Sequence, residues 1–324
     1  MIGAGLGEVH KPPCYGSWMR VLVCLIAITV GCYRGSAPPP APPAPAPKAP
    51  RSVSSSDALA YLPEDSSLVV VADLKELMGS QSMKSFAPLL EKRIPANVAG
   101  YFASCGFDPL TLKRASMGLR NIDATKPRGV MVLRGYRRDV LMKCIEQAHA
   151  AQPSALTIDQ GVVTMNATDS KLALAFADDH TLVIQIGPDA SAESLRAVLD
   201  TGAPLRMNPR FTELIAKLDP SHPLWFVFDD AKVMAGAPLG SPMRSVMGSA
   251  RITDSLITDV RIRFADPGAA ASAATLLQGQ TASAAMFFDE LTINPDELDV
   301  VIHAAMSDAK FASALSLLTG TLGP

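Results

Sequence analysis

Beyond the N-terminal segment, short apolar runs alternate with amphipathic stretches along the chain, which is typical of a folded α+β protein. The runs 68–73 and 224–229 are apolar almost throughout, so they predict buried strands. Apolar and polar residues alternate in 260–264, which predicts a strand with one face toward water. Apolar segments on both sides of short polar turns predict hairpins over 156–165 and 171–186. Consecutive hairpins indicate antiparallel pairing.

One helix is well defined by its local sequence. Asn208 can cap its N-terminus, Pro209 suits the first turn, and the stripe continues to Leu218. Phe211, Leu214 and Ile215 lie on one side of this helix, which predicts that this side is buried. We expect the helix to link two halves of the protein. Further helices are expected at 137–150, 192–199, 267–277 and 310–317.

Three kinds of segment recur in the same order along the chain. The matched pairs are 68–78 with 224–234, 129–150 with 259–277, and 192–202 with 310–320. A conserved order favours an internal duplication, whereas chance recurrence of strand–helix units is the alternative. The spacing between matched segments shrinks along the chain, so the first half carries an extra loop and hairpin. We predict an α+β fold of two related halves, 57–205 and 206–324. Each half is expected to be an antiparallel sheet with helices packed on one face.

The N-terminal segment predicts a targeting signal over 1–31. An apolar run follows Arg20 and ends at Cys32. A helix that spans a bilayer needs ~20 apolar residues, so this run is too short to cross. Its length and the preceding positive charge fit a signal peptide. Nothing before Met19 is needed for such a signal, so Met19 is a candidate for the true start of translation.

The end of this run resembles the lipobox of bacterial lipoproteins. Val30, Gly31 and Cys32 fit the lipobox, but Thr29 stands where the family usually has Leu, Val or Ile. The resemblance implies cleavage before Cys32 and lipidation of its side chain. It also implies a palmitate-class anchor in the cell envelope, for which we expect the periplasmic face of the outer membrane. An ordinary secretory signal and an uncleaved anchor are the alternatives. The remainder is loosely similar to uncharacterised duplicated proteobacterial lipoproteins, without diagnostic motifs.

A tether is predicted between Cys32 and the folded part, over 32–56. Within it, 37–50 contains eight prolines and five alanines. Proline lacks an amide donor and disfavours helix and central strand, so this stretch is expected to form polyproline II. At ~3.1 Å per residue it spans roughly 40 Å. A stiff spacer after a lipidation site lifts a domain off a membrane, although a ligand for a proline-recognition domain is an alternative.

Composition changes this interpretation little. The formal net charge of −2 gives no reason to expect a nucleic-acid partner. The leader and tether contain one acidic residue, Glu8, and a larger number of basic ones, so the folded part is more acidic than the total suggests. Those basic residues are Lys11, Arg20, Arg34, Lys48 and Arg51.

Cysteine and histidine give no motif for a metal, cofactor or nucleophile. Cys14 and Cys24 precede the expected cleavage, which leaves Cys105 and Cys144 in the folded part. Cys144 is expected to be buried on an apolar helix face, and the two cysteines can form a disulfide in an oxidising envelope. The histidines are not at ligand spacing, and structural roles are expected for all of them: His10, His149, His180, His222 and His303. We therefore expect no bound metal and no cofactor.

Two aspartates occupy matched positions at the ends of the apolar runs. Asp73 and Asp229 are expected to cap the segments that follow them, and a functional pair is the alternative. The prolines in 236–242 disfavour a phosphate-binding loop, so this stretch is interpreted as a mobile loop. The methionines around it are expected to fill the core, an adaptable apolar surface being the alternative. They are Met234, Met243 and Met247.

The sequence is compatible with three functions. The favoured one is a membrane-anchored envelope lipoprotein that acts as a non-catalytic binding or scaffolding module for an unknown envelope protein. The second is a carrier of an apolar or lipid ligand between sheet and helices, for which the Ala-rich helix 267–277 could leave space. The third is an enzyme, which requires a cleft that holds His303, Asp73 or Asp229 with a strongly shifted pKa.

Overall fold

A computed structural model of the chain describes residues 58–313, with gaps at 81–82, 85–103, 107–110, 123–127, 152–155, 167–169, 202–204, 231–233, 235–242, 285 and 312. The leader, Cys32 and the tether lie outside the described residues, as do the loop 236–242 and most of the helix expected at 310–317.

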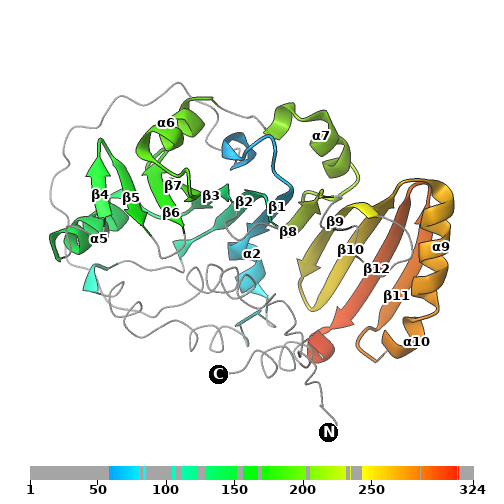
Figure 1. Cartoon of the computed structure of the whole chain (residues 1–324). Helices are drawn as coiled ribbons and strands as arrows, with labels where there is room; N and C mark the ends of the chain where they lie inside the picture. The colour runs from blue at the N-terminus through cyan, green and yellow to red at the C-terminus, as the bar shows by residue number, and fades with distance from the viewer. Residues whose placement is uncertain are drawn as a thin grey trace, which may run out of the picture.

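The described chain is built on one twelve-stranded antiparallel sheet, in the order β11-β12-β10-β9-β8-β1-β2-β3-β7-β6-β5-β4 (Figure 1). Its strands are β1 (Leu68–Asp73), β2 (Arg114–Arg120), β3 (Arg128–Arg134), β4 (Leu156–Asp159), β5 (Val162–Asn166), β6 (Lys171–Phe176), β7 (Thr181–Gly187), β8 (Leu224–Phe228), β9 (Met243–Ile252), β10 (Ser255–Phe264), β11 (Glu290–Asp296) and β12 (Asp299–Ser307).

The predicted α+β class with antiparallel pairing is confirmed, but the two expected sheets are joined into one. The junction is the pair β1–β8, in which Val71 lies opposite Trp225 and Val69 lies opposite Val227. These are the two apolar runs that the sequence predicted as buried strands. Each is the first strand of its half, so their pairing closes the inner edges of both halves. Among the described strands, β4 and β11 then form the two edges of the sheet.

The strand order of the two halves corresponds outward from this junction. The first half runs β1-β2-β3-β7-β6, and the second runs β8-β9-β10-β12-β11. A helix follows the third strand in each half: α5 (Arg138–Ala151) follows β3, and α9 (Pro267–Gln278) follows β10. The first half adds the hairpin β4–β5, which agrees with the extra hairpin that the sequence indicated. That the halves arose by duplication stays a prediction.

The helices lie on two faces of this sheet. The α5 face is the side toward which Met131, Leu133 and Phe264 point, and it is covered by α5 in the first half and by α9 in the second. The α6 face is the opposite side, toward which Val132 and Val227 point, and most other helices pack there. They are η1 (Ala58–Tyr61), α6 (Ala192–Thr201), η3 (Leu205–Met207) and α7 (Pro209–Ile215). The short helices α2 (Leu74–Gly79) and α10 (Thr281–Ala284) follow β1 and α9.

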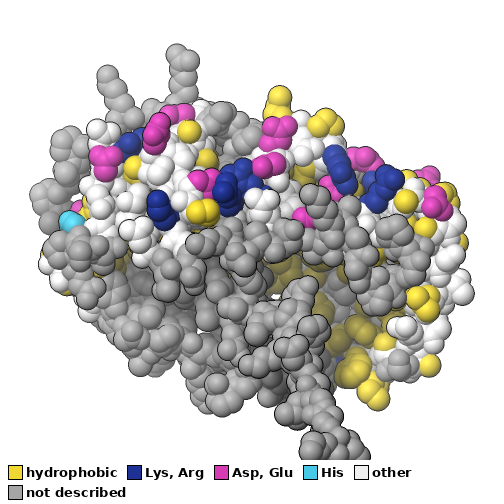
Figure 2. Space-filling view, viewed as in Figure 1, with side chains coloured by type: hydrophobic (Ala, Val, Ile, Leu, Met, Phe, Trp, Pro, Cys, Tyr) yellow, Lys and Arg dark blue, Asp and Glu magenta, His cyan; other side chains and the backbone are white. Residues whose placement is uncertain are grey.

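The first half therefore has helices on both faces, whereas one covered face was expected. Its third strand shows why: five consecutive residues of β3 are buried, so both sides of the strand need a cover. In the second half the expectation holds better, because β10 has half-exposed polar residues on its α6 face. Arg261 and Arg263 point there and pair with acidic residues. In Figure 2, basic and acidic side chains alternate along the upper side of the molecule, so the charge in view is mixed in sign.

Candidate functional site

Helix α7 is positioned by its cap, as the sequence predicted. The side chain of Asn208 accepts hydrogen bonds from the amides of Arg210 (3.0 Å) and Phe211 (3.3 Å). Phe211 and Leu214 are buried, which confirms the predicted apolar side. The helix ends at Ile215, one turn before the predicted end. It thereby lies over the junction of the two halves, beside β8 (Figure 1).

A cleft of about 460 Å³ lies between α7 and the sheet at this junction. Its floor is formed by neighbouring strands, since Val71 pairs with both Ser116 of β2 and Trp225 of β8. Its mouth is formed by the exposed Arg206 and Thr212. The volume falls in the range of ~300–1,000 Å³ that is typical of small-molecule sites. The full lining is Leu59, Val71, Arg114, Ser116, Arg206, Phe211, Thr212, Ile215, Pro220 and Trp225.

Three polar groups on the floor of the cleft have no hydrogen-bond partner. They are the indole Nε1 of Trp225, the Oγ of Ser116 and the Nε of Arg114. Trp225 is 3% exposed and Ser116 is 1% exposed, so solvent reaches them poorly. A buried polar group without a partner costs roughly 1–3 kcal/mol, and such groups are rare in folded proteins. Their convergence on one cleft marks it as the candidate binding site.

The polar lining of the cleft is basic and donor-rich. Trp225 and Arg114 can only donate hydrogen bonds, whereas Ser116 can donate or accept. Both charged side chains of the lining, Arg114 and Arg206, are cationic. Asp73 lies in register with Arg114, but its carboxylate accepts from the Glu76 amide at 3.0 Å instead. The cleft thus presents donors and positive charge beside the apolar surface of Val71, Phe211 and Ile215.

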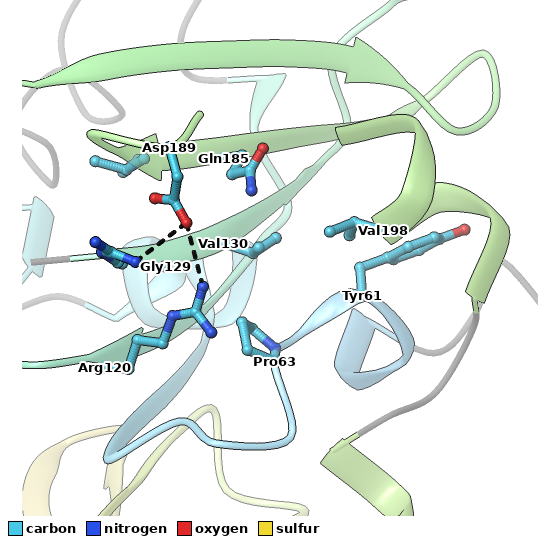
Figure 3. A pocket seen from close by; sticks show the side chains of 10 residues that line it. Tyr61, Pro63, Arg120, Gly129, Val130, Gln185, Asp189 and Val198 are labelled. Carbon is cyan, nitrogen blue, oxygen red and sulfur yellow. Dashed lines mark hydrogen bonds and ion pairs between the residues drawn. The ribbon is translucent and has the colours of Figure 1, made fainter. Parts of the chain in front are cut away.

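A second, smaller cavity of about 150 Å³ lies beside Tyr61, and its charges are already paired (Figure 3). The Asp189 carboxylate lies 3.6 Å from Arg120 and 3.4 Å from Arg128. Arg120 also donates to Asp65 at 2.9 Å, and the Gln185 side chain accepts from Ser194 at 2.7 Å. These contacts hold the loop after β7 to the ends of β2 and β3. The cavity is therefore a weaker candidate than the cleft.

The structure joins Cys105 and Cys144 in a disulfide, with their Cα atoms 5.2 Å apart. The sequence had left this pairing open. Cys144 is 1% exposed on the inner side of α5, so the bond ties the segment before β2 to this helix. The bond lies on the α5 face, away from the cleft, and thus has a structural place in the first half.

The matched aspartates lie at opposite ends of the β1–β8 pair. Asp73 caps α2, as predicted. Asp229 accepts a hydrogen bond from Arg210 at 2.5 Å, and most of the segment that it was expected to cap lies outside the described residues. Burial raises the pKa of Asp229 above its ordinary value, although Arg210 acts in the opposite direction. Because the strands are antiparallel, several residues separate the two carboxylates, which excludes a functional pair.

Two of the histidines, His303 and His222, have side-chain partners, and these lie at separate places in the second half, whereas the buried Nδ1 of His149 has no partner among the described residues. His303 lies 2.8 Å from Asp259 on the polar strands of the second half. His222 contacts Ser249 (3.0 Å) and Asp219 (3.4 Å), which resembles the residue set of a catalytic triad. However, Ser249 is 2% exposed within β9, so a substrate cannot reach its hydroxyl. Neither His303, Asp73 nor Asp229 lines the cleft, and within the described ranges no group of acidic, His or Cys side chains could hold a metal.

Two expectations about apolar positions have different outcomes. Met234, Met243 and Met247 are at most 8% exposed, which confirms that they fill the core. The Ala-rich helix α9 was expected to permit a ligand space, and this is wrong. Its alanines at 270, 273 and 274 are at most 1% exposed and pack on Phe264 and Val300, because their small side chains allow close approach. The space lies under α7 instead.

Sequence reasoning missed the cleft because it missed β2. The strand reads Arg-Ala-Ser-Met-Gly-Leu-Arg, and its α6 face is polar although Ser116 is buried there. The available signal was the position of Trp225 within an apolar run, one of two tryptophans in the chain. A buried indole normally has a partner for its N–H.

Comparisons with known proteins bear on the fold alone. No protein-family model matches the chain, and no curated protein matches it. A solved structure of TP0453, crystal form III, is similar with a TM-score of 0.53 and 8% identity, over 80% of this chain and 98% of that one. Crystal form I of TP0453 has a TM-score of 0.49 and 9% identity over 82% and 98% of the two chains. Crystal form IV has 0.48 and 9% over 80% and 96%. In the part that the structure describes, no helix is long and apolar enough to cross a membrane.

Proposed function

We propose that the protein is a lipid-anchored envelope protein whose folded part binds a small ligand, without catalysis, in the cleft under α7. The observation that carries the binding function is the set of three unpartnered polar atoms on the cleft floor. A ligand that accepts hydrogen bonds from Trp225, Ser116 and Arg114 removes the penalty of leaving them unpaired. This proposal joins the binding module and the ligand carrier that the sequence left as separate hypotheses.

The anchor is supported by the sequence. The apolar run before Cys32 and the tether after it fit a lipidated N-terminus, which holds the binding part roughly 40 Å from a membrane surface. Lipidation is tested by labelled palmitate uptake and membrane fractionation of the full chain and of Cys32→Ala. We expect the variant to lose both the label and processing. If Cys32→Ala stays membrane-bound and unchanged in size, the lipoprotein proposal is wrong.

Ligand binding is tested by native mass spectrometry of the full chain purified from its envelope fraction. The test variant is Thr212→Tyr, which narrows the mouth of the cleft at an exposed helical position. Thr275→Tyr in α9 is the matched control: both threonines are exposed, and both hydroxyls donate to the carbonyl four residues earlier, at 3.1 and 3.0 Å. We expect a bound small molecule in the wild type and in Thr275→Tyr, and its loss in Thr212→Tyr. Equal recovery from all three, or no bound molecule in any, contradicts a ligand in this cleft.

A further inference from the structure

The chemistry of the cleft narrows the class of ligand. Of its ten lining residues, the polar ones on the floor are donors, and the charged ones are arginines. A neutral apolar ligand leaves all three unpartnered atoms unsatisfied, so it gains nothing from them. A cationic ligand meets Arg114 and Arg206 at close range, which is unfavourable at low dielectric. An oxyanion satisfies the donors and the charge together.

The register of the strands places the three donors on the same face of the sheet. Ser116 and Trp225 both lie opposite Val71, one on each side of it, and all three point to the α6 face. Arg114 is two residues from Ser116 on β2, so its side chain points to the same face. All three residues line the same cleft, so one head group in the cleft can be offered hydrogen bonds from both strands. Their positions are built into the sheet, so the donors are held in place before a ligand arrives.

The rest of the cleft is apolar and extends toward α7. Phe211 is 5% exposed, and Leu59 and Ile215 pack against the same core cluster. The hydroxyl of Thr212 is already bonded to the carbonyl of Asn208, so it adds no free donor at the mouth. A ligand with only a charged head group leaves this apolar surface in contact with water. An apolar chain attached to the head group covers it.

We propose that the ligand is an anionic amphiphile, in which a single carboxylate or phosphate head is bound by Trp225, Ser116 and Arg114 and an apolar chain lies along Phe211 and Ile215. This inference rests on the proposed binding function, and it names the ligand class of the same cleft. Carboxylate and phosphate heads share the chemistry that the donors recognise, so the head groups are separate arms of the test.

The test uses four probes with the same eight-carbon chain: octanoate, octyl phosphate, octanol and octylammonium. Binding is followed by the emission of Trp225. The other tryptophan, Trp18, lies in the predicted leader, and Trp18→Phe makes Trp225 the single tryptophan whether or not the leader has been cleaved. The protein is held in phosphatidylcholine vesicles, so that no detergent competes. We expect at least one of the two anions to bind about tenfold or more tightly than octanol, and octylammonium to bind more weakly than octanol. Which anion binds more tightly identifies the head group.

Variants separate the head-group contacts from the fold. Arg114→Gln is expected to reduce anion affinity to that of octanol, whereas Arg244→Gln, at an exposed position of β9 outside the cleft, leaves it unchanged. Should Arg114→Gln not fold, Ser116→Ala replaces it as the test and is expected to weaken anion binding several-fold without affecting octanol.

The outcomes distinguish this inference from the function on which it rests. If octanol binds as tightly as both anions, the anionic class is wrong, although the cleft is still a binding site. If no probe changes the emission of Trp225 while mass spectrometry recovers a molecule that Thr212→Tyr loses, the anionic amphiphile is again wrong and the binding function stands. If neither experiment detects a ligand, both proposals fail.

Discussion

The two halves of the sheet have corresponding strand orders, but the α6 face is apolar and covered in the first half and polar and partly exposed in the second. In the first half, Val130 and Val132 of β3 point to this face and are buried there in a cluster with residues of η1 and α6. In the second half, Arg261 and Arg263 of β10 point to the same face and form ion pairs there. One topology therefore supports a doubly covered half and a half with one polar face, depending on whether its strands are apolar throughout or alternate.

The cleft lies at the junction where the α6 face changes from covered and apolar to polar and partly exposed. Helix α7 packs beside β8 at the junction, and the cleft lies between this helix and the paired strands β1 and β8. There the floor is apolar at Val71 but carries unpartnered donors at Ser116 and Trp225. A fully covered face would leave no entrance, and a fully open face would leave no apolar wall. The border between the halves provides both.

Exchanging the residue types of the two halves on the α6 face is expected to have the largest effect on stability. Val132→Arg places a charge on the covered face, where Val132 is 1% exposed, so we expect a loss of about 4–5 kcal/mol or a failure to fold. The reciprocal Arg261→Val removes a partly exposed pair with Asp296 and a longer contact of 3.9 Å with Asp299. Because Asp299 keeps Arg263 and Lys217, this variant is expected to change stability by less than about 1 kcal/mol. Urea unfolding measures both. Similar losses for the two variants contradict the assignment of one covered and one open face.

Within the open half, a single buried carboxylate organises the charges. Asp299 is 0% exposed and accepts from Arg263 and Lys217, each at 2.9 Å. We expect Asp299→Ala to cost about 3–5 kcal/mol in urea unfolding, because it leaves Arg263 without its main partner. Asp296→Ala, at an exposed pair, is the control and is expected to cost less than about 1 kcal/mol. If Asp299→Ala loses no more stability than Asp296→Ala, the ion pairs of Asp299 contribute no more than surface ion pairs do, and the account is wrong on this point.

The same carboxylate predicts a pH dependence. Burial by itself raises the pKa of Asp299, but the hydrogen bonds from Arg263 and Lys217 outweigh it and hold the pKa below its ordinary value. The folded state therefore binds this proton less readily than the unfolded state, so the contribution is present above the ordinary pKa and lost as pH falls below it. Asp299→Asn is expected to flatten the acid side of the stability profile. If the stability profile of Asp299→Asn keeps the wild-type slope at low pH, other carboxylates are responsible for acid unfolding.

The disulfide is a feature of the first half alone among the described residues, and its removal is expected to cost less stability than Val132→Arg or Asp299→Ala. Cys105 and Cys144 are 39 residues apart, so their bond restricts the unfolded chain of the first half. The double variant Cys105→Ser/Cys144→Ser is expected to lower stability by about 2–4 kcal/mol. Thermal unfolding with and without reductant measures it, and the reductant should affect the wild type alone. A stability loss on reduction of the double variant shows that another group is responsible.

The smallest expected effect concerns the junction. Ser116→Ala removes a buried hydroxyl that has no partner, so the ligand-free protein is expected to gain up to about 1 kcal/mol. Ser249→Ala is the contrast, because that hydroxyl is bonded to His222 and its loss is expected to destabilise by about 1 kcal/mol. Stability is compared by urea unfolding after ligand is removed. A clear loss in Ser116→Ala indicates that its hydroxyl stabilises the fold rather than a ligand.

The sequence predicted those parts of the molecule whose local pattern is sufficient. The apolar runs of β1 and β8, the hairpins of the first half and the cap of α7 at Asn208 are all local features, and the structure contains them. The fusion of the halves depends on the register of β1 against β8, which no local pattern specifies. The cleft was missed for a related reason. Ser116 and Arg114 make β2 less apolar than a buried strand normally is, and these are the residues that form the candidate site.

The central claim is that an anionic amphiphile reaches Trp225 through the mouth of the cleft. The most direct measurement is quenching of Trp225 emission by 2-bromooctanoate in the full chain carrying Trp18→Phe, since bromine quenches an indole only near contact and this bromine is on the carbon next to the carboxylate. We predict saturable quenching that 2-bromooctanol reproduces only at about tenfold or higher concentration, and that Thr212→Tyr abolishes while Thr275→Tyr does not. Quenching that never saturates, or that is the same in both tyrosine variants, contradicts the claim.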